Sequence, residues 1–244
     1  MTIRVGIGGW TFAPWRNSFY PKGLAHSREL AFAASKLTMI EVNGTFYGTM
    51  SPATYAKWAV ETPDNFMFSL KGPRFAVNRR VLADAGDSIQ HFIASGIDRL
   101  GDKLGPILWQ LAATKIFDPE DIASFLNLLP ASVGNLALRH VLEPRHPSFD
   151  DPRLFDLVAA RNVAIVYADA DAYPCFPTQT ADFTYARLQN GQDDEVLGYP
   201  DGALDGWAEQ ARDWNAGGRD TFIAFIHGGK LRAPAAAMSL MSRL

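Results

Sequence analysis

Ionisable side chains crowd one short segment of the chain, residues 138–149, which reads Leu-Arg-His-Val-Leu-Glu-Pro-Arg-His-Pro-Ser-Phe. It begins as an apolar strand and then places Glu143, Arg145 and His146 in quick succession, with one proline after Glu143 and another after His146. Proline lacks a backbone N–H donor, so regular strand pairing must end here. A carboxylate and a guanidinium at the end of a strand can recognise an anion or move a proton. The alternative is an ordinary Glu–Arg ion pair at the corner where a strand meets a loop.

Apolar, β-branched runs alternate with helix-like stretches along the whole chain, and this order predicts parallel strands joined by crossover helices. We expect strands in the segments 3–9, 39–47, 66–71, 106–111, the start of 138–149, 163–169, 184–188 and 221–227. Helices are expected at 27–36, from Ser51-Pro52 towards Glu61, within 82–100, from Asp118, from Asp151 to near Asn162, from Asp205 to Gly217, and from Pro234. The segment around Pro174 and Pro177 has too many prolines for a full helix.

Eight such units in one chain predict an α/β fold, a single (β/α)8 TIM-barrel-like domain over residues 1–244 whose parallel sheet closes into a barrel. A doubly wound open sheet is the competing arrangement. In a barrel, reactive groups gather at the carboxyl ends of the strands. The polar side chains expected there are Trp10, Glu41, Asn43, Lys71, Gln110, Glu143, Arg145, His146, Asp169, Arg187 and His227.

Each of these strand-end residues also has a purely structural explanation. Period-two spacing in the expected strand 39–47 would put Glu41, Asn43, Thr45 and Tyr47 on one face, where Glu41 could be a paired residue of the barrel interior. Lys71 could extend its ammonium to the rim of the barrel, and Arg187 could simply balance the charge of Asp169. The recurrence of carboxylates and cations on several separate strands favours a functional site.

Composition excludes several classes of protein. Hydrophobic residues make up 48% of the 244 residues and charged residues 20%, with a net charge of −3, which is the profile of a globular protein without general affinity for nucleic acid or anionic membranes. Cys175 is the only cysteine, so no intrachain disulfide can form. The sequence has no signal-peptide pattern and no apolar run near the ~20 residues that span a bilayer. We expect a cytoplasmic location and no membrane partner.

Known cofactor motifs do not match. The glycines at 6, 8 and 9 lack the spacing of a dinucleotide site, and there is no P-loop, H-E-x-x-H, G-x-S-x-G or C-x-x-C pattern. Glu143 and Asp169 with a histidine could hold Mg²⁺ or Mn²⁺. We predict no metal and no cofactor, because carboxylates beside Arg and Lys are more often ion-paired than metal-bound.

Several blocks in fixed order resemble the YecE-like family. They are Gly-Gly-Trp at 8–10 with Trp15 and Phe-Tyr-Pro at 19–21, Glu-Val-Asn-Gly-Thr-Phe-Tyr at 41–47, Lys71, Leu-Gly-Pro-Ile-Leu-Trp-Gln-Leu at 104–111, Glu-Pro-Arg-His-Pro-Ser-Phe at 143–149, and Ala-Asp-Phe-x-Tyr-x-Arg at 181–187. The resemblance covers essentially the whole chain. It implies a TIM-barrel-like fold and names no reaction, since members belong to a domain of unknown function. Two departures are Pro144, where the family pattern has Phe, and a last strand that ends in His227-Gly-Gly-Lys230 rather than in asparagines.

These observations predict an enzyme that acts on a small polar substrate bearing a phosphate or carboxylate, by carboxylate acid–base chemistry. The catalytic candidates are Glu41, Glu143 and Lys71. The substrate-binding candidates are Trp10, Asn43, Tyr47, Gln110, Arg145, His146, Asp169 and Arg187, with the two arginines holding the anion. The alternatives are a metal-assisted nucleic-acid phosphodiesterase, for which aromatics would stack bases, and a non-catalytic ligand-binding barrel.

Overall fold

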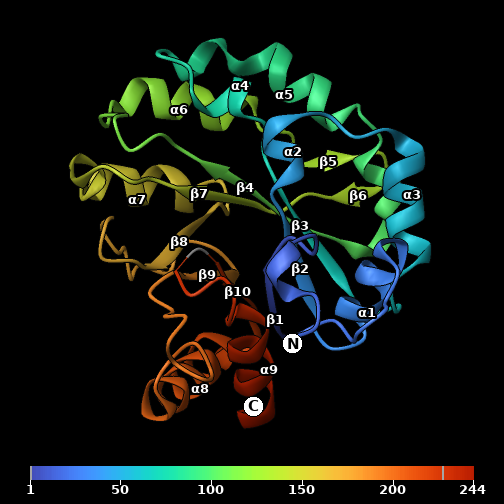
Figure 1. Ribbon diagram of the computed structural model, residues 1–244. Coiled ribbons are helices and arrows are strands. Elements are labelled where there is room, and N and C mark those ends of the chain that lie inside the picture. The colour runs from blue at the N-terminus through green and yellow to red at the C-terminus, as the bar shows by residue number, and fades with distance from the viewer. Residues whose placement is uncertain (1, 227) are drawn as a thin grey trace.

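Parallel strands close into a barrel in the computed structural model, which describes residues 2–226 and 228–244. Around this described barrel the strands follow the order β1-β10-β9-β8-β7-β4-β3-β2 (Figure 1). Their bounds are β1 (Ile3–Gly8), β2 (Met39–Val42), β3 (Met67–Lys71), β4 (Leu104–Gln110), β7 (His140–Glu143), β8 (Ala164–Asp169), β9 (Phe183–Leu188) and β10 (Asp220–Phe225). The predicted closed barrel is confirmed and the open-sheet alternative is wrong. The predicted end of the last strand, His227, lies outside the described residues.

Helices wrap the outside of the barrel (Figure 1). They are α1 (Glu29–Ala34), α2 (Gly44–Tyr47), α3 (Pro52–Val60), α4 (Arg74–Val77), α5 (Gly86–Ile93), α6 (Pro119–Leu128), α7 (Pro152–Ala159), α8 (Asp201–Asn215) and α9 (Ala233–Arg243). The predicted starts at Ser51, Asp118 and Asp151 are confirmed, because each side chain accepts a backbone N–H of the first turn and a proline follows it. No described helix in this fold is both long and apolar enough to cross a membrane.

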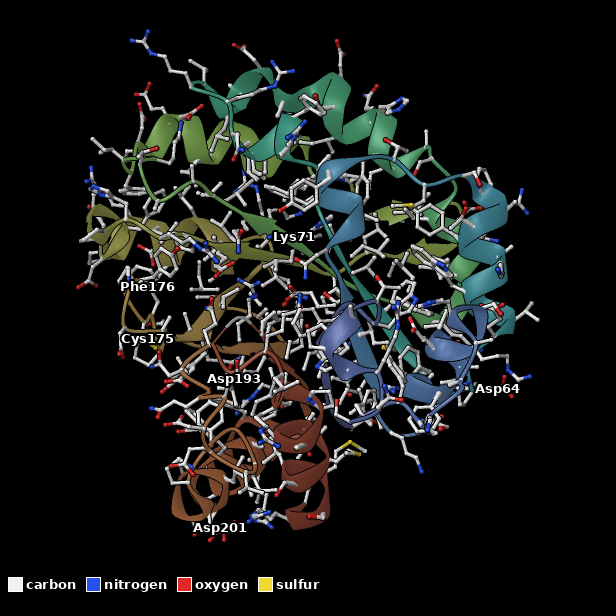
Figure 2. The ribbon with its side chains drawn as sticks, in the orientation of Figure 1. Asp64, Lys71, Cys175, Phe176, Asp193 and Asp201 are labelled. Carbon is white, nitrogen blue, oxygen red and sulfur yellow. The ribbon has the colours of Figure 1, made fainter. Side chains whose placement is uncertain are left out.

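Some predicted helix bounds are wrong. The stretch 82–100 is a 3-10 turn (Leu82–Ala85), then α5, then a second 3-10 segment (Ile97–Lys103) that follows Gly96 in the left-handed region. Helix α8 starts at Asp201, one turn before the expected Asp205. A short antiparallel hairpin of β5 (Ser132–Val133) and β6 (Leu136–Ala137) was not predicted. After β8, residues 170–182 contain no helix, as expected from their prolines; Figure 2 labels Cys175 and Phe176 on this loop.

The second strand is shorter than predicted. It ends at Val42, and Asn43 has helical backbone angles that lead directly into α2. The Thr45 hydroxyl donates to the Lys71 carbonyl oxygen at 2.7 Å and accepts from the Lys71 N–H at 3.1 Å, so it fastens this turn to the end of β3. The expected single face of Glu41, Asn43, Thr45 and Tyr47 is therefore wrong: Thr45 is buried and Tyr47 is 67% exposed.

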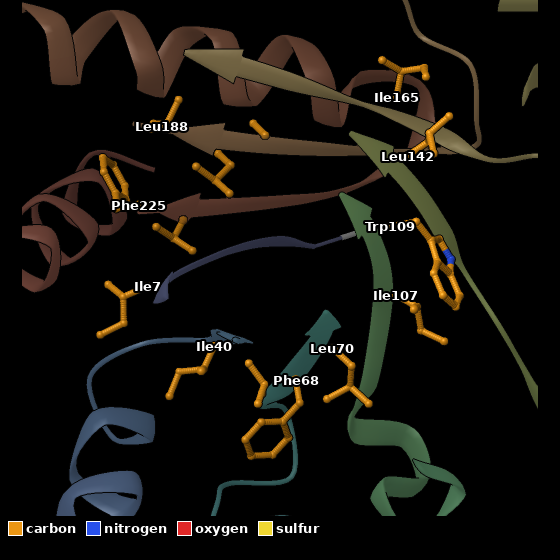
Figure 3. Packing of buried hydrophobic residues seen from close by; sticks show 14 of the residues in the cluster. Ile7, Ile40, Phe68, Leu70, Ile107, Trp109, Leu142, Ile165, Leu188 and Phe225 are labelled. Carbon is orange, nitrogen blue, oxygen red and sulfur yellow. The ribbon is translucent and has the colours of Figure 1, made fainter. Parts of the chain in front are cut away.

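The barrel separates two hydrophobic cores. Outward-facing residues such as Ile7, Ile40, Leu70 and Trp109 pack between the strands and the helices (Figure 3). The alternating residues Met39, Leu108, Val141, Tyr185 and Phe222 form the second cluster, inside the barrel.

The same alternation sets the upper layer of the barrel interior. At the carboxyl ends of the strands the inward positions are Gly8, Glu41, Lys71, Gln110, Glu143, Ala168 and Arg187. Position 8 in this layer requires glycine, since a Cβ there would come within 2.5 Å of the Ile226 side chain. A polar layer thus lies on top of an apolar one, at the end of the barrel where substrates bind in this fold.

Candidate functional site

One guanidinium joins two buried carboxylates across the barrel. Arg187, at the end of β9, donates from Nε and Nη2 to the two oxygens of Glu41, each at 3.1 Å. Its Nη1 lies 2.6 Å from both oxygens of Glu143. All three side chains are almost fully buried. Most of the Arg187 donors are therefore already used within the protein.

Further side chains complete this network. Tyr185, two residues before Arg187 on the same face of β9, donates its hydroxyl to Glu41 at 3.0 Å. Gln110 donates to Glu143 at 2.6 Å, and Arg145 donates to the same carboxylate from Nη2 at 3.1 Å. The Arg145 guanidinium also stacks on the Tyr173 ring, 4.2 Å from its centre. The alternative reading in which Arg187 balances Asp169 is wrong.

The electrostatics of this network keep the buried carboxylate of Glu143 ionised. Burial alone would raise the pKa of Glu143, but Arg187 and Arg145 outweigh burial and hold that pKa below its usual range. Burial alone would lower the pKa of Arg187, but the carboxylates of Glu143 and Glu41 raise it above its usual value. Burial and the neighbouring Glu41 charge raise the pKa of Tyr185 well above its ordinary value. The oxygens of both carboxylates already accept hydrogen bonds within the protein, an arrangement unsuited to proton transfer with a ligand.

Lys71 is the exception within this polar layer. It is the last residue of β3 (labelled in Figure 2) and is 8% exposed. Its ammonium lies over the Phe46 ring, 4.4 Å from the ring centre, and no carboxylate of the described residues is within 4.0 Å of it. Burial lowers the pKa of Lys71 from 10.5 to about 8; Glu41 acts in the opposite direction, and the nearby Arg187 lowers the pKa further. A sizeable fraction of this amine is neutral near physiological pH.

A pocket of about 270 Å³ opens above the polar layer. Its lining residues are Gly8, Trp15, Asn43, Tyr47, Lys71, Gln110, Arg145, Arg187, Gln189, Phe225, Ile226, Lys230 and Ala233. The Nε2 of Gln189 is buried and has no hydrogen-bond partner within the described chain. A buried amide without a partner is costly, so a ligand atom that accepts from it would be stabilised.

A second pocket of about 260 Å³ adjoins the first and shares Gly8, Asn43 and Lys230 with it. Its other lining is largely apolar and includes Trp10, Val42, Met50 and Trp58. The Trp10 ring packs edge-on against Trp58, with 5.1 Å between ring centres. The site therefore has a cationic compartment beside an apolar one.

The eleven residues predicted for the site separate into three groups. Asn43, Tyr47, Lys71, Gln110, Arg145 and Arg187 line the first pocket, and Glu41 and Glu143 lie beneath it. Trp10 lines the apolar pocket instead. His146 and Asp169 lie outside both linings. His146 accepts a backbone N–H from Ser148 at the start of a 3-10 turn, and Asp169 accepts from Asn190 at 2.9 Å and from Tyr199 at 2.8 Å.

Among the pocket residues missed in the sequence, Gln189 and Lys230 carry polar side chains with N–H donors for a ligand. Gln189 follows Arg187 at the period-two spacing of β9, so the same alternation that selected Arg187 would have indicated it. Lys230 follows the double glycine after the last strand, and its ammonium lies 4.4 Å from the centre of the Phe12 ring. The position of Lys230 depends on the turn at Gly229, which has a positive φ of 59°. The sequence alone does not show that this turn brings Lys230 back to the pocket.

The described residues hold no group of three or more His, Cys, Asp or Glu side chains arranged for a metal ion. Glu143, named above as a candidate ligand, has both oxygens bound to Arg187. Both Asp169 oxygens accept hydrogen bonds from Asn190 and Tyr199. The oxygens that a metal ion would need are thus already bonded to protein donors, a guanidinium for Glu143 and an amide and a hydroxyl for Asp169.

Comparison with known proteins gives a family and a fold. Residues 4–244 match the family described as "Protein of unknown function DUF72". A 69-residue stretch is 30% identical to UPF0759 protein YunF of Bacillus subtilis (strain 168); it covers 28% of this chain and only 23% of that protein. Crystal structures of DUF72 family proteins from Enterococcus faecalis V583 and Thermotoga maritima MSB8 superpose with TM-scores of 0.79 and 0.76, at 17% and 20% identity. These superpositions cover 100% and 99% of this chain, and 95% and 97% of the other chains, which supports a shared fold.

Proposed function

This chain belongs to the DUF72 family, and we propose that it is an enzyme acting on a small substrate that bears a carboxylate or phosphate group. The observation that carries this proposal is the charge around the pocket. Lys71, Arg145, Arg187 and Lys230 line it, while two carboxylates, Glu41 and Glu143, lie beneath it, in a chain whose net charge is −3. A local surplus of cations against the overall balance suits a compact anion.

The donors available to such an anion are not those expected from the sequence. Arg187 has given most of its N–H groups to Glu41 and Glu143, so it acts as a fixed positive charge rather than as a fork for the ligand. Arg145 retains donors beyond its bonds to Glu143, and Lys71 and Lys230 have no carboxylate partner among the described residues. We assign anion binding to these three side chains, with Gln189 and Asn43 as neutral donors.

The roles of the three catalytic candidates differ accordingly. Glu41 and Glu143 are proposed as positioning residues, which hold Arg187 and set the field around Lys71. Lys71 is proposed as the reacting group, because it lines the pocket and its amine is neutral in part near physiological pH. Tyr47, Gln110 and the apolar pocket beside Trp10 would surround the rest of the substrate.

Anion binding is tested by thermal melting of the purified chain with phosphate, sulfate and small carboxylates, each at matched ionic strength. We expect the melting temperature to rise with ligand concentration by mass action. Arg145→Ala should weaken that response at least tenfold, whereas Arg153→Ala, which removes an exposed pair with Asp151, should not change it. Carboxylates with an aromatic group should bind more tightly than acetate, because the adjoining pocket is apolar.

Two further measurements separate the competing functions. If duplex DNA bound tightly with a steep salt dependence while small anions gave no shift, a phosphodiesterase would replace this proposal. Incubation with a cell extract, followed by mass spectrometry, should reveal a metabolite consumed by the unaltered chain and not by Lys71→Met. Anion binding without any turnover would indicate a ligand-binding barrel instead.

The finer sequence expectations stay predictions. They are the narrower resemblance to the YecE-like proteins, the single domain over residues 1–244, the absence of metal and cofactor, and the cytoplasmic location. The resemblance to the YecE-like proteins does not identify a substrate.

A further inference from the structure

We propose that Lys71 forms an imine with an aldehyde or ketone that carries a carboxylate or phosphate group. This inference rests on the proposed function for the anionic group of the ligand, and adds the covalent chemistry of the amine. Its geometric basis is the position of Lys71 at the end of β3, where the residue lines the pocket while only 8% of its surface is exposed and its ammonium lies over the Phe46 ring.

The surroundings of Lys71 leave its nitrogen available for attack. A structural buried lysine needs acceptors: Lys103 donates to the carbonyl oxygens of Ala59 and Thr62, both at 2.6 Å. Lys71 instead has an aromatic ring on one side and cationic guanidiniums nearby, with no acceptor within hydrogen-bond distance among the described residues. Burial without acceptors lowers the pKa to about 8 and makes the amine a nucleophile at neutral pH.

The groups around Lys71 suit a carbonyl ligand in particular. Arg145, through the donors left over from its bonds to Glu143, and Lys230 would bind its anionic group and hold the carbonyl carbon beside the amine. The positive charge of Arg187 would stabilise the oxygen as the carbon–oxygen double bond opens. Glu41 is close enough to influence the charge of Lys71 and would favour the iminium once it has formed.

The reaction balances without any further reagent. The nitrogen lone pair of neutral Lys71 attacks the carbonyl carbon, and the former π pair becomes an alkoxide that takes one of the two protons of the attacking nitrogen. The resulting carbinolamine loses its hydroxyl group together with the remaining N–H proton, as one water molecule, while the nitrogen lone pair forms the carbon–nitrogen double bond. The products are one imine and one water molecule, with no change of oxidation state.

The test is reductive trapping with cyanoborohydride, which delivers hydride to the iminium and leaves a stable secondary amine. The probes are pyruvate, glyoxylate and dihydroxyacetone phosphate, with neutral dihydroxyacetone for comparison. Near pH 7.4 a lysine of pKa about 8 has roughly 250 times more neutral amine than an ordinary lysine. We therefore expect peptide mapping of the unaltered chain to find the adduct on Lys71 at least tenfold ahead of any exposed lysine.

Variants provide the controls. Lys71→Arg keeps the charge but removes the nucleophile, so it should lose the rapidly formed adduct. Lys57→Arg, at an exposed pair with Glu61 on α3, should retain it. Adducts spread over the exposed lysines of the unaltered chain would overturn the inference even if Lys71→Arg failed to fold.

The outcomes also distinguish this inference from the proposed function. Anion-dependent melting shifts with no adduct on Lys71 would overturn the imine and leave the anion site standing. An adduct on Lys71 that formed equally with neutral dihydroxyacetone, and that sulfate did not suppress, would support the imine and remove the anion site. Faster trapping of the anionic probes, suppressed by sulfate, would support both.

Discussion

The ammonium of Lys71 lies 4.4 Å from the centre of the Phe46 ring, in a layer where the neighbouring arginine has two carboxylate partners. A cation over an aromatic face gains about 0.5–2 kcal/mol, which is less than the loss of hydration for a buried ammonium. Phe46 belongs to α2, the turn that Thr45 fastens to the end of β3. The turn immediately after β2 thus covers one side of the buried Lys71 ammonium, whose pKa is lowered chiefly by burial.

Replacing this lysine should stabilise the fold. Lys71→Met removes a buried cation that has no carboxylate partner among the described residues, and should raise the free energy of unfolding by about 1–3 kcal/mol at neutral pH. The measurement is denaturant unfolding of both chains. Lys103→Met is the matched control and should lower stability, because Lys103 donates to two partly buried backbone carbonyl oxygens. A loss of stability in Lys71→Met would make that lysine a structural residue.

The difference in the free energy of unfolding between the unaltered chain and Lys71→Met should depend on pH. The pKa of Lys71 is about 8 in the folded chain and 10.5 when unperturbed, so the unfolded chain binds more protons between these values. The stability of the unaltered chain therefore rises with pH over this window relative to Lys71→Met. The difference between the two chains should be largest below pH 8 and should shrink towards pH 10.5. A constant difference would mean that Lys71 titrates normally.

Limited proteolysis should cleave the barrel in its loops without producing two independently folded halves. Residues 170–182 and 189–200 contain no helix or strand, so limited proteolysis should cleave there first. The strands β1 and β10 pair with each other although they lie at opposite ends of the chain, so neither half can close its own sheet. The nicked chain should stay together and unfold in one transition. Two fragments of similar size that each unfold cooperatively would contradict the single-domain expectation.

The sequence predicted which residues face the barrel interior better than it predicted which of them pair with one another. Strand alternation and the barrel rule were enough to select Glu41, Lys71, Gln110, Glu143 and Arg187 as inward residues at one end. Those rules describe single strands, whereas the pairing of Arg187 with Glu41 joins residues 146 positions apart. Only closure of the barrel brings β9 across from β2, which is why the nearby Asp169 was the more obvious partner in the sequence.

Side chains beyond the strand ends were harder to predict. The chain turns at Asn43 because the Thr45 hydroxyl bonds to the backbone of a different strand, a contact that period-two spacing ignores. The local bond of His146 to Ser148 and the bonds of Asp169 to a distant loop take both residues out of the pocket lining. Alternation gives the direction of a residue within a strand, but tertiary contacts decide where the following loop goes.

The contributions of Arg187, Glu41 and Glu143 to stability should be strongly non-additive. Arg187→Met leaves Glu41 without a cation in hydrogen-bond contact and should cost roughly 3–5 kcal/mol of stability. Adding Glu41→Gln and Glu143→Gln to the same chain removes the stranded charges, so the triple variant should recover part of that loss rather than add to it.

Denaturant unfolding of the single and triple variants measures this coupling. The control variant is Arg153→Ala, which removes an arginine–carboxylate pair on the surface. The Nη2 of Arg153 lies 2.6 Å from an Asp151 oxygen, a distance similar to that in the buried pairs. Arg153→Ala should leave the unfolding midpoint nearly unchanged, because solvent screens that pair. Additive losses in the triple variant would mean that the three side chains contribute independently. In that case the two glutamates would be free to serve as acid and base, and the positioning role proposed for them would be abandoned.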